Sequence, residues 1–346
     1  MSAGQDHRHR RATRALRIAI AGAVFLIAAA TALGWWAIRP VASPGASATP
    51  VTVIIPPGEP AAGIGRRLAG AGLVRSPWVV VAVARLLGVA DRLRHGEYAL
   101  SPAQSAIEMV RILARGESVQ HRVTVPEGYT VIQIADALAA AGLADRERFL
   151  DLALRGGRRF ERPTLAGLVS GSLEGYLFPD TYHFTRGLDE AAVVERFLDR
   201  FDARVDPALR EAARARGLTL HELLTVASMV ERETRVPDER PIIAGVIYNR
   251  LARGMRLEID ATVLYALGEH RPVVTFRDLE VESPYNTYRY AGLPPGPIAN
   301  PGLASIRAAA APASVPFLFY VLKPDGRHHF SRTLSEHLDA VRRYRR

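Results

Sequence analysis

The pattern of apolar and polar residues divides the chain into one uncharged run near its start and shorter periodic segments after it. Residues 18–38 carry no charged side chain, and about 20 such residues in a helix span the ~30 Å core of a bilayer. Further on, apolar residues recur every three to four positions, which is typical of helices with one buried face. The predicted helices cover residues 191–201, 207–216, 220–233 and 238–251, and short apolar runs predict strands near 263–265 and 317–322.

An internal repeat lies between these regions. Residues 53–58 (VIIPPG) align with residues 123–128 (VTVPEG), a shift of 70 residues. Each copy predicts a short strand, a turn at Pro and Gly, and a helix that ends at a glycine. In the first copy a second helix (78–87) and a strand (97–100) follow. In the second copy, Thr181–Phe184 is expected to supply the closing strand.

Composition excludes several classes of chemistry. The chain of 346 residues has room for two or three domains, and its apolar fraction of 48% is that of a globular protein. It contains no cysteine, so disulfides, thiolate catalysis and Cys-ligated zinc are excluded. The net charge of +10 suits nucleic acid, an anionic membrane surface or an acidic polymer. We find no nucleic-acid motif, and the histidines form no metal-ligand pattern.

The flanks of the uncharged run predict how it crosses the membrane. Arginines precede the run, whereas beyond Arg39 no basic residue occurs before Arg66. Trp35 and Trp36 lie at its far end, where interfacial aromatic residues belong. The N-terminus is therefore expected in the cytoplasm and the rest of the chain outside. The alternative is a cleaved signal peptide, but its apolar region would be shorter, and the small residues 46–48 lie well beyond the run.

Three later segments combine carboxylates, aromatic hydroxyls and an amide with tight-turn residues, as a carbohydrate-cleaving cleft requires. They are residues 173–182 (LEGYLFPDTY), 227–234 (ASMVERET), and 283–288 (SPYNTY) with the following 292–298 (GLPPGPI). On a helix over 220–233, Glu231 continues the apolar stripe, and Glu233 lies about 200° further round. A carboxylate on a buried face must be paired, or protonated as a general acid is. The alternative for Glu231 is a structural salt bridge with Arg235 or Arg250.

In this order the three segments resemble the endolytic murein transglycosylase family, MltG or YceG-like, and the resemblance runs from the N-terminal anchor nearly to the C-terminus. In that family the catalytic residue is the first Glu of a V-E-x-E-T segment, which corresponds to Glu231. The resemblance implies a lytic transglycosylase that needs one carboxyl group and no metal or organic cofactor. Family members have Asp-Pro-Thr where this chain has Asp260-Ala261-Thr262, which changes the rigidity of that loop.

The remaining predicted site residues are substrate contacts. Tyr rings pack on sugar faces, and Tyr and Asn head groups bind hydroxyl and N-acetyl groups. The predicted contacts are Glu174, Tyr176, Asp180, Tyr182, Tyr285, Asn286 and Tyr288, together with Asn249 and Asp260, which match the pattern of the family that the chain resembles. The alternative for the tyrosine loop is packed structural side chains, and for Asp180 a cap of its own turn.

These observations predict an α+β protein with one N-terminal transmembrane helix, a LysM-like β-α-α-β module and a mainly helical α+β catalytic domain. The predicted segments are a basic cytoplasmic N-terminus (1–17), the membrane helix (18–38), a linker (39–50), the LysM-like module (51–120), a second copy joined to the catalytic domain (121–165) and the catalytic domain (166–346). The activity that the family resemblance implies is endolytic cleavage of the MurNAc–GlcNAc bond, leaving 1,6-anhydroMurNAc ends. Expected partners are glycan strands, the cytoplasmic membrane and peptidoglycan polymerases, the penicillin-binding proteins, with no nucleic acid. The alternative is a non-catalytic peptidoglycan-binding scaffold.

Overall fold

The computed structural model describes residues 3–42, 49–168, 170–269 and 273–344. Two compact units divide the chain. The first contains Met1–Gln120 with Thr185–Leu188, and the second contains His121–Phe184 with Asp189–Arg346. Each unit is described below by itself.

The first unit begins with helix α1 (Ala3–Ile38), which extends the predicted membrane helix into the basic N-terminus. Within it, Ile20–Ile38 is long and apolar enough to cross a membrane, with a mean hydropathy of 1.8, and no second such helix is found among the described residues. Half of the predicted linker, 39–50, falls on residues 43–48, which lie outside the described residues, as does the alternative cleavage site at 46–48.

The rest of the first unit has the predicted β-α-α-β order. Strand β1 pairs antiparallel with β2, with Val51 opposite Leu100 and Ile55 opposite Gly96. Ile64, Leu68 and Tyr98 are fully buried between this sheet and the helices. The elements are β1 (Val51–Ile55), α2 (Ala61–Gly70), α3 (Pro77–Leu86), β2 (Gly96–Leu100) and α4 (Ala106–Arg115).

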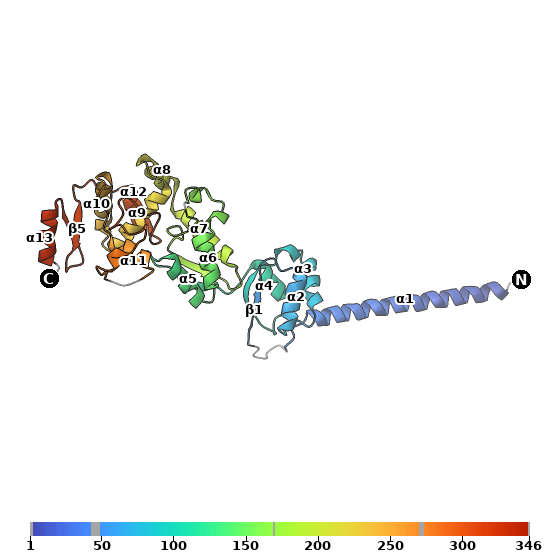
Figure 1. Ribbon diagram of the computed structural model, residues 1–346. Coiled ribbons are helices and arrows are strands. Elements are labelled where there is room, and N and C mark those ends of the chain that lie inside the picture. The colour runs from blue at the N-terminus through green and yellow to red at the C-terminus, as the bar shows by residue number, and fades with distance from the viewer. Residues whose placement is uncertain (1–2, 43–48, 169, 270–272, 345–346) are drawn as a thin grey trace. The chain divides into compact units, whose positions relative to one another are not determined.

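The second unit is mainly helical and carries two short sheets (Figure 1). Its helices are α5 (Val131–Ala140), α6 (Arg146–Arg155), α7 (Glu190–Arg204), α8 (Pro207–Ala215), α9 (Leu220–Glu233), α10 (Arg240–Ala252), α11 (Asp260–Leu267), α12 (Leu303–Ala310) and α13 (Leu334–Tyr344). Its strands are β3 (His121–Thr124), β4 (Thr181–Phe184), β5 (Phe319–Leu322) and β6 (His328–Ser331).

The repeat is confirmed by the structure at the predicted shift. Helix α5 corresponds to α2, and β3 pairs antiparallel with β4, with His121 opposite Phe184. The strand predicted at Thr181–Phe184 therefore closes the second copy. Glycines with positive φ, Gly58 at 73° and Gly128 at 80°, occupy the same place in the two turns, a conformation that favours glycine.

The four helices predicted after residue 190 are confirmed as α7 to α10, and the strand near 317–322 as β5. The strand predicted near 263–265 is wrong, because these residues lie in helix α11. Thr262 and Val263 are fully buried there, and the Thr262 hydroxyl donates to the Ile259 carbonyl oxygen at 2.7 Å. Burial and this local hydrogen bond outweigh the β preference of the branched residues.

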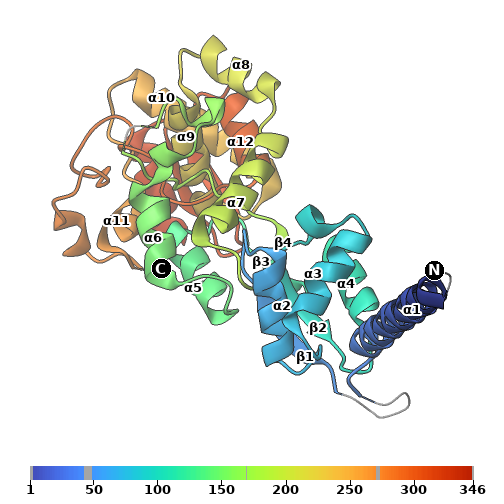
Figure 2. The same cartoon turned by 90° about the vertical axis from the view of Figure 1, so that its right-hand side faces the viewer.

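Helix α9 forms the centre of the second unit and packs against α10 and α12 (Figure 2). Its N-terminus is closed by a capping box between Thr219 and Glu222. Leu223, Leu224 and Val230 are fully buried along it. The Ser228 hydroxyl accepts the Ile298 N–H at 3.0 Å, so the segment before α12 is held beside the C-terminal half of α9.

The buried amide of Asn300 joins this segment to two others. Its Oδ1 accepts the N–H groups of Gly175 and Leu177, both at 2.9 Å. Its Nδ2 donates to the Tyr129 carbonyl oxygen at 3.0 Å and to Oε1 of Glu174 at 2.9 Å. Because one side chain satisfies four buried groups, the segments around residues 129, 175 and 300 are held in one geometry.

Glu174 is the acidic member of this network and is buried, with 3% exposure. Its carboxyl accepts the Val131 N–H at the start of α5 as well as the Asn300 amide. Burial raises its pKa to about 8, although the hydrogen bonds from Val131, Tyr265 and Asn300 lower it in part. The neutral carboxyl is therefore the form that this interior favours.

We predict that Glu174→Gln makes the stability of the fold less dependent on pH. In the wild type the unfolded chain loses this proton near pH 4.5, whereas the folded chain keeps it up to about pH 8. The free energy of unfolding therefore falls as pH rises through this window, by up to about 1.4 kcal/mol per pH unit. Chemical unfolding of the full chain in detergent at pH 5 and pH 8 measures this loss.

The loss of stability between the two pH values should be smaller in Glu174→Gln than in the wild type. Glu147→Gln is the control, because Glu147 is 80% exposed and its removal should leave the wild-type pH dependence intact. Equal losses in the wild type and Glu174→Gln would show that Glu174 ionises normally in the folded chain.

Candidate active site

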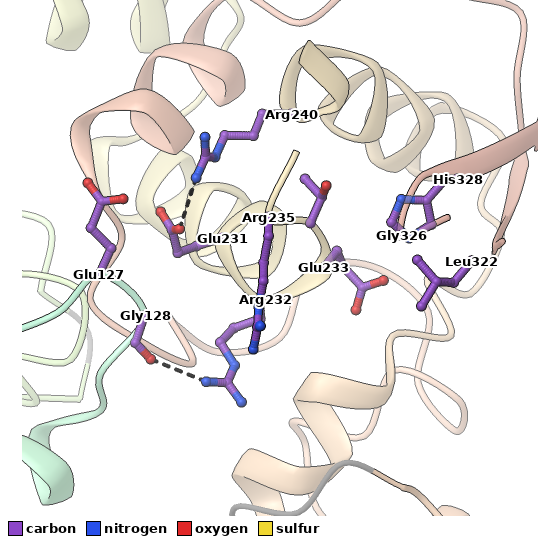
Figure 3. Close-up of a pocket in the computed structure, with 11 residues that line it drawn as sticks. Glu127, Gly128, Glu231, Arg232, Glu233, Arg235, Arg240, Leu322, Gly326 and His328 are labelled. Atoms are coloured by element: carbon purple, nitrogen blue, oxygen red, sulfur yellow. Dashed lines mark hydrogen bonds and ion pairs between the residues drawn. The ribbon is translucent and has the colours of Figure 1, made fainter. Parts of the chain in front are cut away.

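A polar pocket of about 650 Å³ opens beside the C-terminal end of α9. Figure 3 shows its side chains, which come from α9, the turn after β3, the start of α10 and the β5–β6 hairpin. The lining residues are Glu127, Gly128, Glu231, Arg232, Glu233, Thr234, Arg235, Arg240, Leu322, Gly326 and His328. Three carboxylates and three arginines thus meet at one surface.

Glu231 lies in the last turn of α9, and its side chain is only 7% exposed. Its Oε2 accepts the Gly302 N–H at 2.9 Å, and its Oε1 lies 3.5 Å from Nη2 of Arg240. The buried carboxyl is therefore paired, which is one of the two states expected for a carboxyl group on a buried face. Its ionic partner is Arg240, however, and not Arg235 or Arg250.

Gly302 lies at the N-terminus of α12, next to the carboxyl groups of Glu231 and Glu127. A Cβ atom on Gly302 would lie 1.9 Å from Oε1 of Glu127, so no other residue fits without moving that carboxyl. Its φ of −72° is open to any residue, so a side chain here would be opposed by the position of the Glu127 carboxyl and not by the backbone. Because Gly302 caps the N-terminus of α12, its N–H presents the positive end of that helix to Glu231.

Glu233 also lines the pocket, although its place on the helical wheel is opposite that of Glu231. The Tyr320 hydroxyl donates to its Oε2 at 2.8 Å. Burial raises the pKa of Glu233 to about 7, and the charge of Asp260 raises it further, while the Tyr320 hydrogen bond and Arg232 oppose this. Glu233 therefore changes charge near neutral pH.

A second pocket of about 350 Å³ shares Glu233 with the first. Two of the predicted contacts, Asp260 and Tyr288, line this second pocket. The Tyr288 hydroxyl donates to Oδ1 of Asp260 at 2.5 Å. Burial raises the pKa of Tyr288, and its hydrogen bond to Asp260 adds to this, so its hydroxyl stays protonated. Asp260 and Tyr288 thus line a pocket that adjoins α9, the helix that carries Glu231.

The other predicted contacts in the segment 174–182 line neither of these two pockets. Tyr176 is fully buried, with its hydroxyl 3.1 Å from Nδ1 of His221. The Tyr182 hydroxyl donates to the Phe178 carbonyl oxygen. Asp180 pairs with Arg200; although burial raises its pKa, the Thr181 N–H and Arg200 lower it below its usual value. Together with Glu174, these side chains hold the interior of the unit.

Asn249, Tyr285 and Asn286 are likewise outside both pockets. Asn249 donates to the carbonyl oxygens of residues 315 and 317, at 2.7 and 3.0 Å. Asn286 is fully buried and donates to those of residues 279 and 281, both at 2.9 Å. The Tyr285 ring packs against Tyr265 at 4.8 Å. In these contacts the two amides organise loops and the tyrosine packs against its neighbour.

Sequence reasoning missed Glu127, Arg240 and His328 as pocket residues. One signal was available for Glu127, since the repeat has Pro57 at the equivalent turn position, and only the second copy carries a carboxylate. Arg240 and His328 have no such signal, because their place depends on how α10 and the β5–β6 hairpin pack against α9. No group of three His, Asp or Glu side chains suited to a metal ion occurs within the described residues.

Comparison with known proteins places the chain among relatives of one kind. The chain is 32% identical over 312 residues to the endolytic murein transglycosylase of Bacillus subtilis (strain 168), and 86% of each chain is covered. It is 32% identical over 323 residues to the protein of that name from Streptococcus pneumoniae serotype 2, which covers 83% of this chain and 57% of that protein.

A crystal structure of a YceG-like protein from Listeria monocytogenes matches with a TM-score of 0.58 at 33% identity, covering 85% of this chain and 100% of that one. The model of the YceG-like family matches residues 53–343, which include both repeat copies and every pocket residue described above. The chain therefore belongs to the YceG-like family.

Proposed function

We propose that this chain is a membrane-anchored endolytic lytic transglycosylase that cuts the MurNAc–GlcNAc bond of peptidoglycan strands. The observation that carries the proposal is the buried carboxyl of Glu231 in the wall of a 650 Å³ pocket, in a chain whose curated relatives are named endolytic murein transglycosylases.

Glu231 serves in this reaction as general acid and then as general base. Its protonated carboxyl gives a proton to the glycosidic oxygen as the bond to C1 of MurNAc breaks. The resulting carboxylate takes the proton of the MurNAc C6 hydroxyl, whose oxygen closes on C1. The products are a free GlcNAc hydroxyl and a 1,6-anhydroMurNAc end, and no water is consumed.

The arginines of the pocket suit a substrate rich in carboxylates and amide oxygens. Arg232, Arg235 and Arg240 line the pocket, and their guanidinium groups are the proposed donors to acceptors on the sugar. Asp260 and Tyr288 in the adjoining pocket extend the proposed contacts along the strand. The other contacts predicted from the sequence act on the substrate indirectly, by holding the loops around the pocket.

The apolar helix Ile20–Ile38 is the proposed anchor, with the N-terminus in the cytoplasm and the pocket outside. The anchor keeps the enzyme near strands that are still linked to the membrane, where penicillin-binding proteins polymerise them. The β-α-α-β unit at 51–100 has the element order of a LysM module, and we assign it contact with the glycan.

The central prediction is that Glu231→Gln binds glycan strands and does not cut them. Removing a general acid and base lowers the rate by about 10²- to 10⁴-fold, while the amide keeps the shape of the side chain. Full-length protein in detergent is incubated with purified strands, and mass spectrometry detects the 1,6-anhydro ends that the wild type forms.

Glu282→Gln serves as the control, because Glu282 is 81% exposed and its loss should leave the rate unchanged. Reducing ends in place of anhydro ends would refute the lyase mechanism. Strand binding without any cleavage by the wild type would favour the non-catalytic scaffold.

A second prediction concerns pH. Because the pKa of Glu233 is about 7, its carboxyl is neutral below that pH and charged above it. An anionic strand should therefore bind about fivefold more weakly at pH 8 than at pH 6, which corresponds to about 1 kcal/mol of added repulsion. Strand affinity of the non-cutting Glu231→Gln variant, measured across this range, gives the size of the step.

The step should vanish when Glu233→Gln is added to Glu231→Gln. If the double variant keeps the same pH dependence, the titrating group that controls binding is not Glu233.

A further inference from the structure

Glu127 is a carboxylate of the pocket to which the proposed mechanism gives no role. It follows β3 in the turn of the second repeat copy, and it is exposed towards the pocket. Figure 3 shows its carboxyl group next to that of Glu231, with Arg240 beside both. The equivalent residue of the first copy is Pro57, so the fold of the turn does not require an acid here.

The backbone holds Glu127 in this place. The Gly128 N–H donates to the Asn300 carbonyl oxygen at 2.9 Å, and the Asn300 N–H donates to the Tyr129 carbonyl oxygen at 2.8 Å. These paired bonds fix the turn against the segment that leads to Gly302. The carboxyl of Glu127 consequently packs directly on Gly302, whose added Cβ would lie 1.9 Å from Oε1 and 2.7 Å from Oε2.

Glu231 and Glu127 therefore meet at one residue, but only Glu231 has partners there. Gly302 donates its N–H to Glu231, which also pairs with Arg240. Within the described part of the chain, the Glu127 carboxyl forms no hydrogen bond or ion pair. Burial raises the pKa of Glu127, and the charge of Glu231 raises it further, while Arg240 lowers it in part.

This arrangement poses a problem for a general acid. Glu231 must carry a proton to begin the reaction, yet the groups that face its two oxygens in the structure, the Gly302 N–H and the Arg240 guanidinium, are both donors. Two carboxyl groups that share a site keep one proton between them. Glu127 has no donor partner among the described residues, so it is the member of the pair on which we place that proton.

We propose that Glu127 is a positioning residue that holds the proton of the carboxyl pair in the resting enzyme and passes it to Glu231 when the strand binds. This inference rests on the proposed function of the same site. Glu231 then protonates the glycosidic oxygen, recovers a proton from the C6 hydroxyl, and returns it to Glu127. The net count of protons is unchanged over a turnover.

Several other charged groups face this pair and set its titration. They are Arg232 and Glu233 on α9, Arg235 after it, Arg240 on α10, and His328 on β6, which pairs with Glu239. Each of them remains in every variant below, so a change in the pH profile reports on the Glu127–Glu231 pair.

The experiment is the pH dependence of kcat for the full chain in detergent. Glu127→Gln should lower kcat about 10- to 100-fold near pH 7 with KM nearly unchanged. Its rate should recover as pH falls, because solvent then protonates Glu231 directly, and the alkaline limb of the profile should move down by at least one pH unit. Glu127→Asp should restore the limb towards its wild-type position, and Glu147→Gln, a surface control, should leave the profile unchanged.

A lower kcat with the limb in its wild-type place would overturn the proposal, since a merely structural role of Glu127 gives that result. A readout without turnover separates this failure from that of the proposed function. In ¹³C-carboxyl NMR titrations of the labelled full chain, Glu231→Gln should lower the midpoint of Glu127, because it removes the neighbouring negative charge. If the midpoint of Glu127 does not move, the two carboxyl groups share no proton, and this inference is refuted even if the enzyme is active. If the midpoint moves but the wild type cuts no strands, the carboxyl pair is supported and only the proposed function is refuted.

Discussion

The site depends on the four hydrogen bonds of one buried side chain, Asn300. Its amide satisfies the backbone of residues 129, 175 and 177 and the carboxyl of Glu174. Without it, the buried N–H groups of Gly175 and Leu177 would lose the acceptor that the structure gives them. Two residues further on, Gly302 receives Glu231 from one side and Glu127 from the other. The geometry of the carboxyl pair is therefore a consequence of a network that does not touch the pocket.

The three carboxyl groups of the pocket differ in the groups that contact them. Glu231 has a guanidinium and a helix N-terminus as partners, Glu233 has a phenol, and Glu127 has neither kind of partner. Three carboxylates within one pocket thus lie in three electrostatic environments. Such a division allows one group to be charged while its neighbours are neutral at the same pH, as proton transfer chemistry requires.

Local patterns in the sequence predicted the repeat, the helices after residue 190 and the strand partner at Thr181–Phe184, because each depends on periodicity or turn chemistry. The strand expected near 263–265 failed, since tertiary burial of Thr262 and Val263 decided it. Glu231 was found through its motif. Tyr176 and Asn286 are predicted substrate contacts because aromatic and amide groups suit sugars, but the same groups also suit buried positions, where the structure places both. Contacts such as Arg240 with Glu231 need the packing of whole helices and leave no local signal.

The carboxyl pair joins parts of the chain that are far apart in sequence. Tyr129 and Asn300 are 171 residues apart, and Glu231 and Gly302 are 71 residues apart. In the proposed topology, with the pocket outside the membrane, the chain has no complete pocket until the residues up to α12 and the β5–β6 hairpin have been exported. Under that proposal, partly exported molecules and fragments truncated before α12 would lack the complete site and could not cut the wall, so the order of export would delay activity until the chain is whole.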